Sequence, residues 1–475
     1  MRIAYWSPLP PARSGIADYS ADLLPALARH VDVELVVPDG WRAPASASAL
    51  ANLPAHAERA FAGLADGGRF DAVVYQLGNN RDYHAEIYRS LLRHPGVVVL
   101  HEYVLHHLVR DLTLHAGDAA AYVAEMRYAY GLSGDALARR CLATGVPLDP
   151  WSYPLFERAV DRSRGVLVNN RFTLDRLRAS RPAARAAVAP HPIDLQAIAP
   201  APAAARAALG LPADAFVVAA FGFLTAAKRP RVLLRAFARL RRRAPGATLV
   251  LAGEVSPHFD FAAVAPPELM HGVTVTGRLD MARFLLHMAA ADVGVNLRHP
   301  TAGETSATLI RLLAMAKPTI VSRTGSFAEI PEGCCAHVDL DDTEEDLLVA
   351  CLERLESDAG LRRALGANAR LYVETHHGLE AAARAYADML RGVVASAAQP
   401  FRALPPLAPY PADDVASDLV RAVSAEMCDL GVGESDDDLL AAVAEPLAEL
   451  MDLEEAAPPP AAPLRRGPPG GGLRR

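Results

Sequence analysis

The chain has 475 residues, of which 51% are apolar, and this length and apolar content favour two domains rather than one. Its formal net charge of −7 is small for the size, and the Lys and Arg residues are scattered among acids, so no face for nucleic acid is expected. Five cysteines without CxxC spacing favour free thiols in a reducing cytoplasm, and the absence of any run approaching ~18 apolar residues limits membrane contact to a peripheral one.

Short apolar runs alternate with helical patterns through the first half of the chain. The runs are RIAYW at 2–6, DVELVV at 32–37, DAVVYQL at 71–77, GVVVL at 96–100 and GVLVNN at 165–170, with helices expected from about Ile16 and Arg171. Continuous apolar strands separated by helices are typical of a parallel sheet that is buried on both faces. We therefore expect a Rossmann-like α/β domain over residues 1–198.

The same rhythm restarts after a Pro- and Ala-rich segment at 199–214. Apolar runs follow at 215–222, 247–253, 272–277, 292–297 and 318–322, with a helix expected near 231–243, so we expect a second Rossmann-like domain over residues 213–377. A long helical pattern at 378–398 is expected to cross back to the first domain. Residues 399–475 are expected to form an acidic helical segment and then a disordered Pro/Gly-rich tail.

Polar residues stand at the carboxyl end of one predicted strand of the second domain. The segment LRHPTAGETSATLIRLLAMAKPTIVS at 297–322 predicts a strand end, a loop at 298–303 and a helix whose first turn contains Glu304, Thr305 and Ser306. The free N–H groups and hydroxyls of such a turn suit a phosphate, and Glu304 suits the hydroxyls of a sugar. Ser, Thr and Glu are also common in a plain helix cap, so that alternative stays open.

A lysine follows the first strand of the second domain in the same way. In FGFLTAAKRP at 221–230, Lys228 is expected at the carboxyl end of the strand, where an ammonium group can neutralise a diphosphate leaving group. A solvated surface lysine is the alternative. The segment HEYVLHH at 101–107 superficially suggests zinc, but His101 and His106 do not meet the HExxH spacing, so no metal is expected.

Taken in order, the segments FGFLTAAKRP, LVLAGE, VTVTGRLD, ADVGVNLRHPTAGETSATLIRLLAMAKPTIVS and TGSFAEI resemble the nucleotide-binding domain of family 4 glycosyltransferases of the GT-B fold. In the first half, SPLPPARSGIADYSADLLPAL is similar to that family's glycine-bearing first loop, and VVVLHEYVLHH to its acceptor-side histidine segment. The resemblance covers roughly residues 1–395. It implies two domains facing a cleft, a nucleoside-diphosphate sugar as donor, a glycan, lipid-linked or small-molecule acceptor, retention at the anomeric carbon, and no further cofactor.

The resemblance also implies roles for particular residues. Lys228 would hold the diphosphate, Glu304 would contact sugar hydroxyls, and His101 would lie near the reactive face of the transferred sugar. Among the donor-binding residues, Gly15 would allow close approach of the first loop, and Thr305 and Ser306 would present N–H groups. The full donor-binding set is Gly15, Gly222, Arg229, Arg278, Arg298, Thr305, Ser306 and Glu329, the last with a structural role as an equal alternative.

Two positions depart from the family pattern. Phe223 stands where the family usually has an arginine, so Arg229, Arg278 or Arg298 would have to substitute. The second glutamate, which normally grips the ribose, is replaced by Arg311 or Leu313, depending on the register of alignment. These departures leave a non-catalytic sugar-nucleotide sensor or scaffold as an alternative, besides an epimerase or phosphorylase on the same fold.

Overall fold

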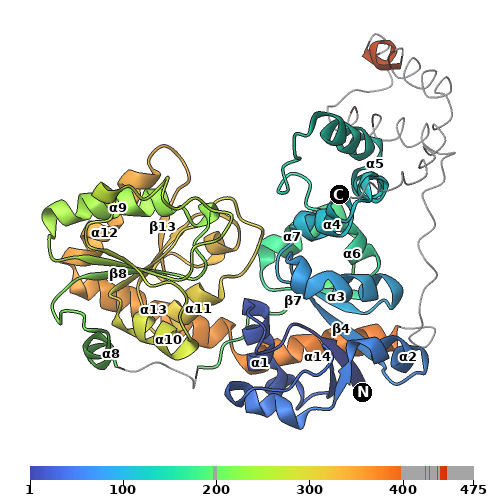
Figure 1. Ribbon diagram of the computed structural model, residues 1–475, viewed down its shortest axis with the longest axis horizontal. Coiled ribbons are helices and arrows are strands. Elements are labelled where there is room, and N and C mark those ends of the chain that lie inside the picture. Colours follow the sequence, from blue (N-terminus) through green and yellow to red (C-terminus); the bar gives the residue numbers. More distant parts are fainter. Residues whose placement is uncertain are drawn as a thin grey trace, which may run out of the picture.

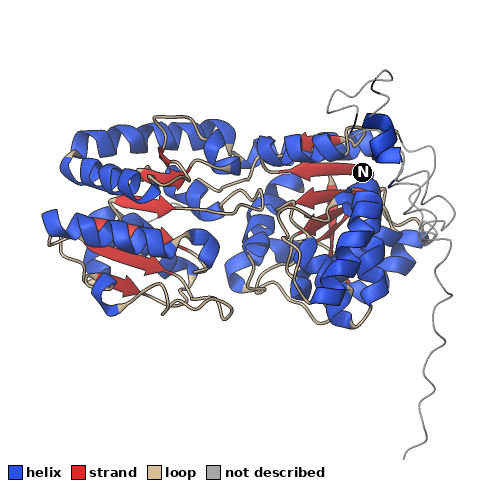
Figure 2. Cartoon of the chain, turned by 90° about the horizontal axis from the view of Figure 1, so that it is seen from above, coloured by secondary structure: helices blue, strands red, loops and turns tan. Residues whose placement is uncertain are grey.

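The computed structural model of the chain describes residues 1–195 and 201–396, together with 423, 427, 436, 439–444 and 446. Two parallel sheets lie side by side, and each has helices on both faces (Figures 1 and 2). The tail at 399–475, predicted to be helical and then disordered, lies almost entirely outside the described residues. Among the few tail residues that are described, 439–444 are helical. None of the described helices is both long enough and apolar enough to cross a membrane.

The first sheet has seven parallel strands in the order β3-β2-β1-β4-β5-β6-β7. Their bounds are β1 (Arg2–Trp6), β2 (Asp32–Val37), β3 (Ala55–Ala57), β4 (Ala72–Leu77), β5 (Val97–Leu100), β6 (Gly165–Val168) and β7 (Ala186–Val188). The five inner strands are the apolar runs identified in the sequence. The two edge strands, β3 and β7, have three residues each, which is too short for a periodic pattern to reveal.

Helices connect these strands and cover the first sheet. They are α1 (Gly15–Leu27), α2 (Phe61–Asp66), α3 (Arg81–Arg93), α4 (His106–Leu112), α5 (Ala119–Thr144), α6 (Glu157–Asp161) and α7 (Arg171–Ser180). Side chains of the preceding residues cap the two helices nearest the other domain. Ser14 accepts from the N–H of Ile16 at the start of α1, and Asn170 accepts from the N–H of Thr173 at the start of α7.

The second sheet has six parallel strands in the order β10-β9-β8-β11-β12-β13. The strands are β8 (Val217–Phe221), β9 (Thr248–Ala252), β10 (Val273–Val275), β11 (Val293–Asn296), β12 (Thr319–Ser322) and β13 (Ala336–Val338). Its helices are α8 (Pro202–Leu209), α9 (Pro230–Arg243), α10 (Met281–Ala290), α11 (Ala307–Ala314), α12 (Glu344–Ser357) and α13 (Ala359–His376).

Helix α8 changes the expected domain boundary. The sequence placed the start of the second domain at residue 213 because 199–214 is Pro/Ala-rich. In the structure α8 packs against α10, and Arg206 pairs with Asp292 at 2.5 Å and donates to the carbonyl of Ala290 at 3.1 Å. These contacts join α8 to the second domain, which therefore starts ahead of residue 213.

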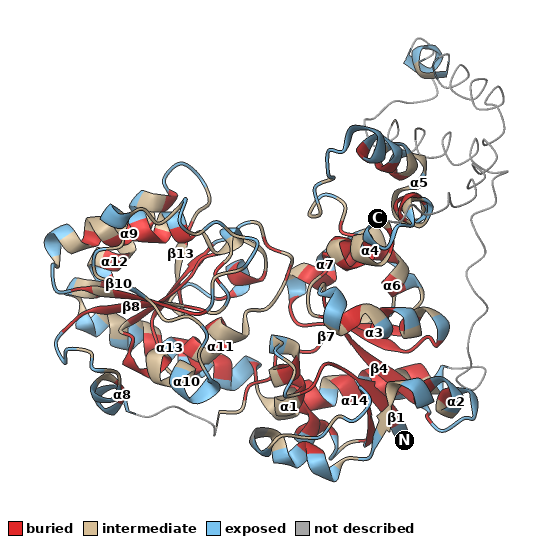
Figure 3. Cartoon of the chain, in the orientation of Figure 1, coloured by how far each residue is buried: buried red, intermediate tan, exposed pale blue. Residues whose placement is uncertain are grey.

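The last described long helix, α14 (Leu379–Ala395), lies on the first sheet although it follows the second domain in sequence (Figure 1). Its buried side chains, among them Tyr386 and Leu390, share one apolar cluster with Leu23 and Leu24 of α1. The Tyr386 hydroxyl is 2.8 Å from that of Tyr19. The core of the first domain is thus completed by a helix from the end of the described body, and burial is concentrated on the strands of both sheets (Figure 3).

The strand order sets where ligands can bind. In each sheet the order reverses beside the first strand, between β1 and β4 and between β8 and β11, and loops that follow these strands leave the same edge. A cleft of about 310 Å³ lies between the domains, lined by α1, α10 and α11. The predicted fold class, two Rossmann-like parallel-sheet domains facing a cleft, is confirmed.

Candidate functional site

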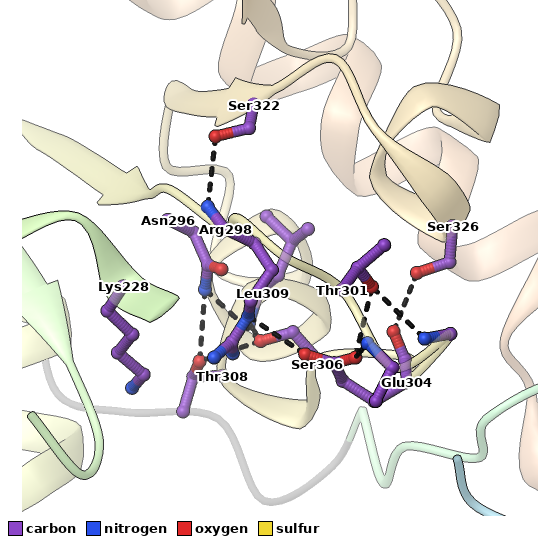
Figure 4. A network of polar contacts seen from close by, with 12 residues as sticks. Lys228, Asn296, Arg298, Thr301, Glu304, Ser306, Thr308, Leu309, Ser322 and Ser326 are labelled. Atoms are coloured by element: carbon purple, nitrogen blue, oxygen red, sulfur yellow. Dashed lines mark hydrogen bonds and ion pairs between the residues drawn. The ribbon is translucent and has the colours of Figure 1, made fainter. Parts of the chain in front are cut away.

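The loop at 298–306 carries the polar segment singled out in the sequence. The structure corrects its boundary with the helix: α11 begins at Ala307, and Ser306 is its N-cap, whose Oγ accepts from the N–H of Leu309 at 3.3 Å. Glu304 therefore lies in the loop and not in the first turn. Its carboxylate accepts from the N–H of Ala302 at 2.8 Å and from the Thr301 hydroxyl at 3.1 Å, so the chain folds back on itself before the helix starts (Figure 4).

Three charged side chains lie near one another at the carboxyl ends of β8 and β11. Arg298 Nε lies 2.8 Å from Glu304 Oε1, and Lys228 is close enough to feel both charges. Burial, with a smaller contribution from the positive charge of Arg298, lowers the pKa of Lys228 to about 7 against the opposing effect of Glu304. The Lys228 ammonium donates to the carbonyl of Phe221 and passes close to Gly222, where an added Cβ would lie 2.7 Å from Nζ.

Of the three arginines expected to replace the missing family arginine, the structure brings only Arg298 to Lys228. Arg229 adopts a left-handed backbone conformation with φ 54°, and its guanidinium turns to the buried Glu344 at the start of α12, with Nε 3.1 Å from Oε1. Arg278 is exposed in the turn after β10. Phe223, at the family position, is 47% exposed. Arg298 is therefore the candidate for the second cation of the site.

Thr305 and Ser306 occupy the approach to α11. The Thr305 hydroxyl accepts from Asn170 Nδ2 of the first domain at 2.9 Å, and the Ser306 hydroxyl accepts from Asn296 Nδ2 at 3.1 Å. Within the part of the chain that the structure describes, the backbone N–H groups of both residues donate to no protein acceptor. Those N–H groups are the ones that the sequence assigned to a phosphate.

Glu329 serves the contact between the domains. Its carboxylate accepts from the backbone N–H of Arg171 at 3.1 Å and from that of Phe172, at the start of α7. The side chain thus caps a helix of the first domain from the second domain. This arrangement is the structural alternative that the sequence left beside a role in the donor pocket.

The first domain contributes His101 and an acid that the sequence analysis missed. His101 Nε2 donates to Gln76 Oε1 at 2.7 Å, and burial holds the pKa of the imidazole well below its usual value, so the ring is neutral. The next residue, Glu102, accepts from the N–H of Asn79 at 2.9 Å. Burial, together with the negative charge of nearby Glu304, raises the pKa of Glu102 to about 7. The HE pair at the end of an apolar run was the signal, but only its histidine was considered.

The remaining expected residues lie on α1 and α11, two of the helices that line the cleft. Gly15 is exposed at the start of α1, and an added Cβ would meet nothing within 4 Å. Arg311 lines the cleft and its guanidinium lies 3.3 Å from Asp22 of α1, whereas Leu313 is fully buried. Arg311 is therefore the residue that faces the cleft where the family pattern has its second glutamate. Among the described residues, no three His, Cys, Asp or Glu side chains are grouped so that they could hold a metal ion.

Comparison with known proteins relates this site to a family. Residues 215–358 match the family described as Glycosyl transferases group 1. The chain is 37% identical to D-inositol 3-phosphate glycosyltransferase of Saccharomonospora viridis over 146 residues, which are 29% of this chain and 33% of that protein. The chain thus aligns with about a third of the length of this relative.

Solved structures share the whole architecture. Sucrose-phosphate synthase from Thermosynechococcus elongatus is similar with a TM-score of 0.61 at 19% identity, over 84% of this chain and 100% of that chain. HepE from Anabaena in complex with UDP-glucose gives a TM-score of 0.58 at 14% identity, over 82% of this chain and 100% of that chain. At these identities the likeness establishes the fold. The chain therefore has the GT-B fold, and its residues 215–358 match the group 1 glycosyltransferase family.

Proposed function

We propose that the protein is a retaining glycosyltransferase that moves a sugar from a nucleoside-diphosphate sugar to an acceptor hydroxyl. The observation that carries the proposal is the meeting of Lys228, Arg298 and Glu304 at the carboxyl ends of β8 and β11, inside the segment that matches the group 1 family. Two cations and one acid at a strand edge suit a leaving diphosphate and the hydroxyls of the sugar attached to it.

Each group has a part in the proposed reaction. Lys228, Arg298 and the unpartnered N–H groups of Thr305 and Ser306 stabilise negative charge on the departing diphosphate, while Glu304 accepts hydrogen bonds from sugar hydroxyls. The bond from the anomeric carbon to the diphosphate oxygen breaks. The acceptor oxygen then bonds to that carbon from the same face, and its proton passes to the departing diphosphate oxygen.

The acceptor approaches from the first domain in this proposal. His101 and Glu102 follow the carboxyl end of β5, and Glu102 lies near Glu304 of the second domain. A neutral imidazole and a carboxyl group whose pKa is raised to about 7 are both suited to orient hydroxyl groups. We further propose a cytoplasmic location, supported by the free thiols of Cys141, Cys334, Cys335 and Cys351.

The donor is best sought by thermal-shift screening of UDP, GDP, ADP and their sugars. UDP and its sugars come first because the HepE structures contain UDP and UDP-glucose. A ligand at ~100 times its dissociation constant adds ~2.7 kcal/mol to the free energy of unfolding. The donor found is then incubated with an acceptor panel, and the anomeric configuration of the product is read by NMR.

The outcomes separate the alternatives. Acceptor-dependent transfer with retention supports the proposal, and inversion contradicts the retaining step. Conversion of the donor without an acceptor would indicate an epimerase, and a requirement for free phosphate a phosphorylase. Nucleotide binding without turnover across the panel would indicate a sensor or scaffold.

The proposed reaction uses no metal ion and no further cofactor, because Lys228 and Arg298 supply the positive charge at the diphosphate. We therefore expect the transfer rate to be unchanged after dialysis against EDTA. A rate that EDTA abolishes and Mg²⁺ or Mn²⁺ restores would contradict this assignment.

A further inference from the structure

The Glu304 loop, residues 301–306, is held from outside its own domain. Three successive carbonyl groups of this loop accept hydrogen bonds. Ala302 O accepts from the N–H of Tyr103 at 2.9 Å, Gly303 O accepts from Asn170 Nδ2 at 2.7 Å, and Glu304 O accepts from the Ser326 hydroxyl at 2.6 Å. The first two donors belong to the first domain. The shape of the loop therefore depends on the domains being together.

The amino-terminal turn of α7 makes most of this contact. Asn170 Nδ2 also donates to the Thr305 hydroxyl at 2.9 Å, and the Thr173 hydroxyl donates to Gly303 O at 2.8 Å. In the opposite direction, Glu329 of the second domain accepts from the first N–H groups of α7. Each domain thus satisfies backbone groups of the other, which neither could satisfy alone.

Gly303 lets the two backbones approach this closely. Its φ is +79°, and an added Cβ would lie 2.5 Å from Thr173 Oγ1 and 2.6 Å from Tyr103 Cδ1. Thr173 and Tyr103 are themselves buried, so neither has room to withdraw. The contact is therefore a packed one, in which the hydrogen bonds have defined partners.

We propose that the start of α7 positions the Glu304 loop, with Asn170 and Thr173 as positioning residues that make the loop competent only when the domains are closed. Glu304 and its partner Arg298 lie on or beside the segment whose carbonyls α7 and Tyr103 hold. Loss of these donors leaves buried carbonyls unpaired, so the loop relaxes and the carboxylate leaves the place where it meets Lys228 and Arg298. Only the kinetic consequence of this inference rests on the proposed function.

The test uses the full chain and two kinds of variant. Asn170→Asp keeps the oxygen that caps Thr173 but replaces the donor to Gly303 O and Thr305 by a carboxylate, and Thr173→Val removes the second donor at nearly constant shape. Glu329→Ala removes both carboxylate oxygens that accept from the start of α7, and it does so at an exposed position. Asp358→Asn, at the N-cap of α13, is the control for an exchange between amide and carboxylate at a helix start.

The first measurement is hydrogen exchange of peptides covering 101–105 and 170–175, which requires no activity. The Tyr103 amide bonds to Ala302 O across the interface, so we expect its exchange to accelerate about tenfold or more in Asn170→Asp/Thr173→Val and in Glu329→Ala. Exchange in Asp358→Asn should match the parent chain. An unprotected Tyr103 amide in the parent chain, or unchanged protection in both variants, overturns the inference.

The second measurement is kinetic. In Asn170→Asp we expect kcat to fall about tenfold or more while the Kd of the bare nucleoside diphosphate changes little, because the cations of the site are untouched. A merely structural residue would lower the melting temperature and leave kcat unchanged. If the parent chain transfers no sugar but exchange responds as expected, the proposed function fails and the positioning role stands.

Discussion

Lys228 occupies a site that disfavours its own charge until an anion arrives. Burial and the positive charge of Arg298 lower its pKa to about 7, and the single nearby acid, Glu304, offsets only part of this lowering. A diphosphate brings negative charge to the same place and favours the ammonium form. Binding of the diphosphate and protonation of Lys228 are therefore coupled.

This coupling has a measurable sign. At about pH 8, Lys228 is mostly neutral in the protein without ligand, so binding of UDP, or of the diphosphate that the screen selects, should take up a proton. At about pH 6, Lys228 is already mostly protonated before binding, so no proton uptake is expected. Calorimetry in two buffers of different ionisation enthalpy measures the uptake. Lys228→Met should bind more weakly and show no uptake at either pH. A binding heat that is independent of buffer at the higher pH would show that Lys228 does not meet the diphosphate.

Glu304 can no longer be a simple helix cap, because it lies ahead of the N-cap Ser306. Two alternatives remain. Glu304 stabilises the loop through its hydrogen bonds with Ala302 and Thr301, or it does so and also holds sugar hydroxyls. Glu304→Gln keeps one acceptor oxygen, so we expect a stability loss of about 1 kcal/mol. If the carboxylate also holds the sugar in the transition state, kcat should fall by about one to three orders of magnitude, roughly 1.4 to 4 kcal/mol.

The control for this variant is binding of the bare diphosphate, which has no sugar for Glu304 to contact. Its Kd should stay within about threefold of the parent value. Normal turnover in Glu304→Gln would show that Glu304 only stabilises the loop.

At the scale of elements, the start of α7 and the Glu304 loop should depend on the glycine between them. Gly303→Ala adds both a clash with Thr173 and Tyr103 and the strain of a positive φ. Gly210→Ala adds the strain alone, because Gly210 has φ +66° and nothing within 4 Å of its Cβ position. We expect Gly303→Ala to lower transfer and the protection of the Tyr103 amide, and Gly210→Ala to lower only the melting temperature. Equal effects in both variants would show that the close approach is unimportant.

The elements themselves were largely predictable, because buried parallel strands are continuous apolar runs and each of the inner ones was found. The short edge strands β3, β7 and β13 carry too few residues for such a pattern. The start of α11 was misplaced because Glu304, Thr305 and Ser306 are all good cap residues, and only the fold of the loop selects Ser306. The sequence could not show that Arg298, and not Arg229, is the arginine near Lys228. Arg229 is directed to Glu344 by its left-handed backbone conformation, which no local sequence pattern predicts.

The contacts between domains were beyond any local pattern. Asn170 and Thr305 are 135 residues apart, and the sequence around neither residue predicts a contact with the other. Glu102 was visible beside His101, but its importance follows from its nearness to Glu304 of the other domain. The sequence thus predicted the residues of the second domain's site better than the way the first domain completes it.

At the scale of the whole molecule, the described part of the chain lies first in one domain, then in the other and then on the first again, and the two connecting segments touch. The N–H of Ile193 donates to the carbonyl of His377 at 3.1 Å, and His377 Nδ1 donates to the carbonyl of His191 at 3.0 Å. After the second connecting segment, α14 returns to cover the sheet of the first domain. The core of the first domain therefore includes α14, which follows the second domain in the sequence. The stability of the first domain thus depends on this last long described helix.

Two truncations test this dependence on α14. Ending the chain after residue 398 removes none of the described core residues, so we expect the melting temperature and transfer to a soluble acceptor to be nearly unchanged. Ending it after residue 377 removes Tyr386, Leu390 and their buried neighbours, and each large side chain lost from a core costs about 1.5 to 3 kcal/mol. Since a domain has only about 5 to 15 kcal/mol of stability in all, the shorter chain should be insoluble or unfolded. Tyr386→Phe is the graded version, because it removes only the hydroxyl that bonds Tyr19 and accepts from Gln76, and should cost about 1 to 3 kcal/mol. A cooperative thermal transition of the first domain itself, retained by the 377-residue chain, would show that this domain folds without α14.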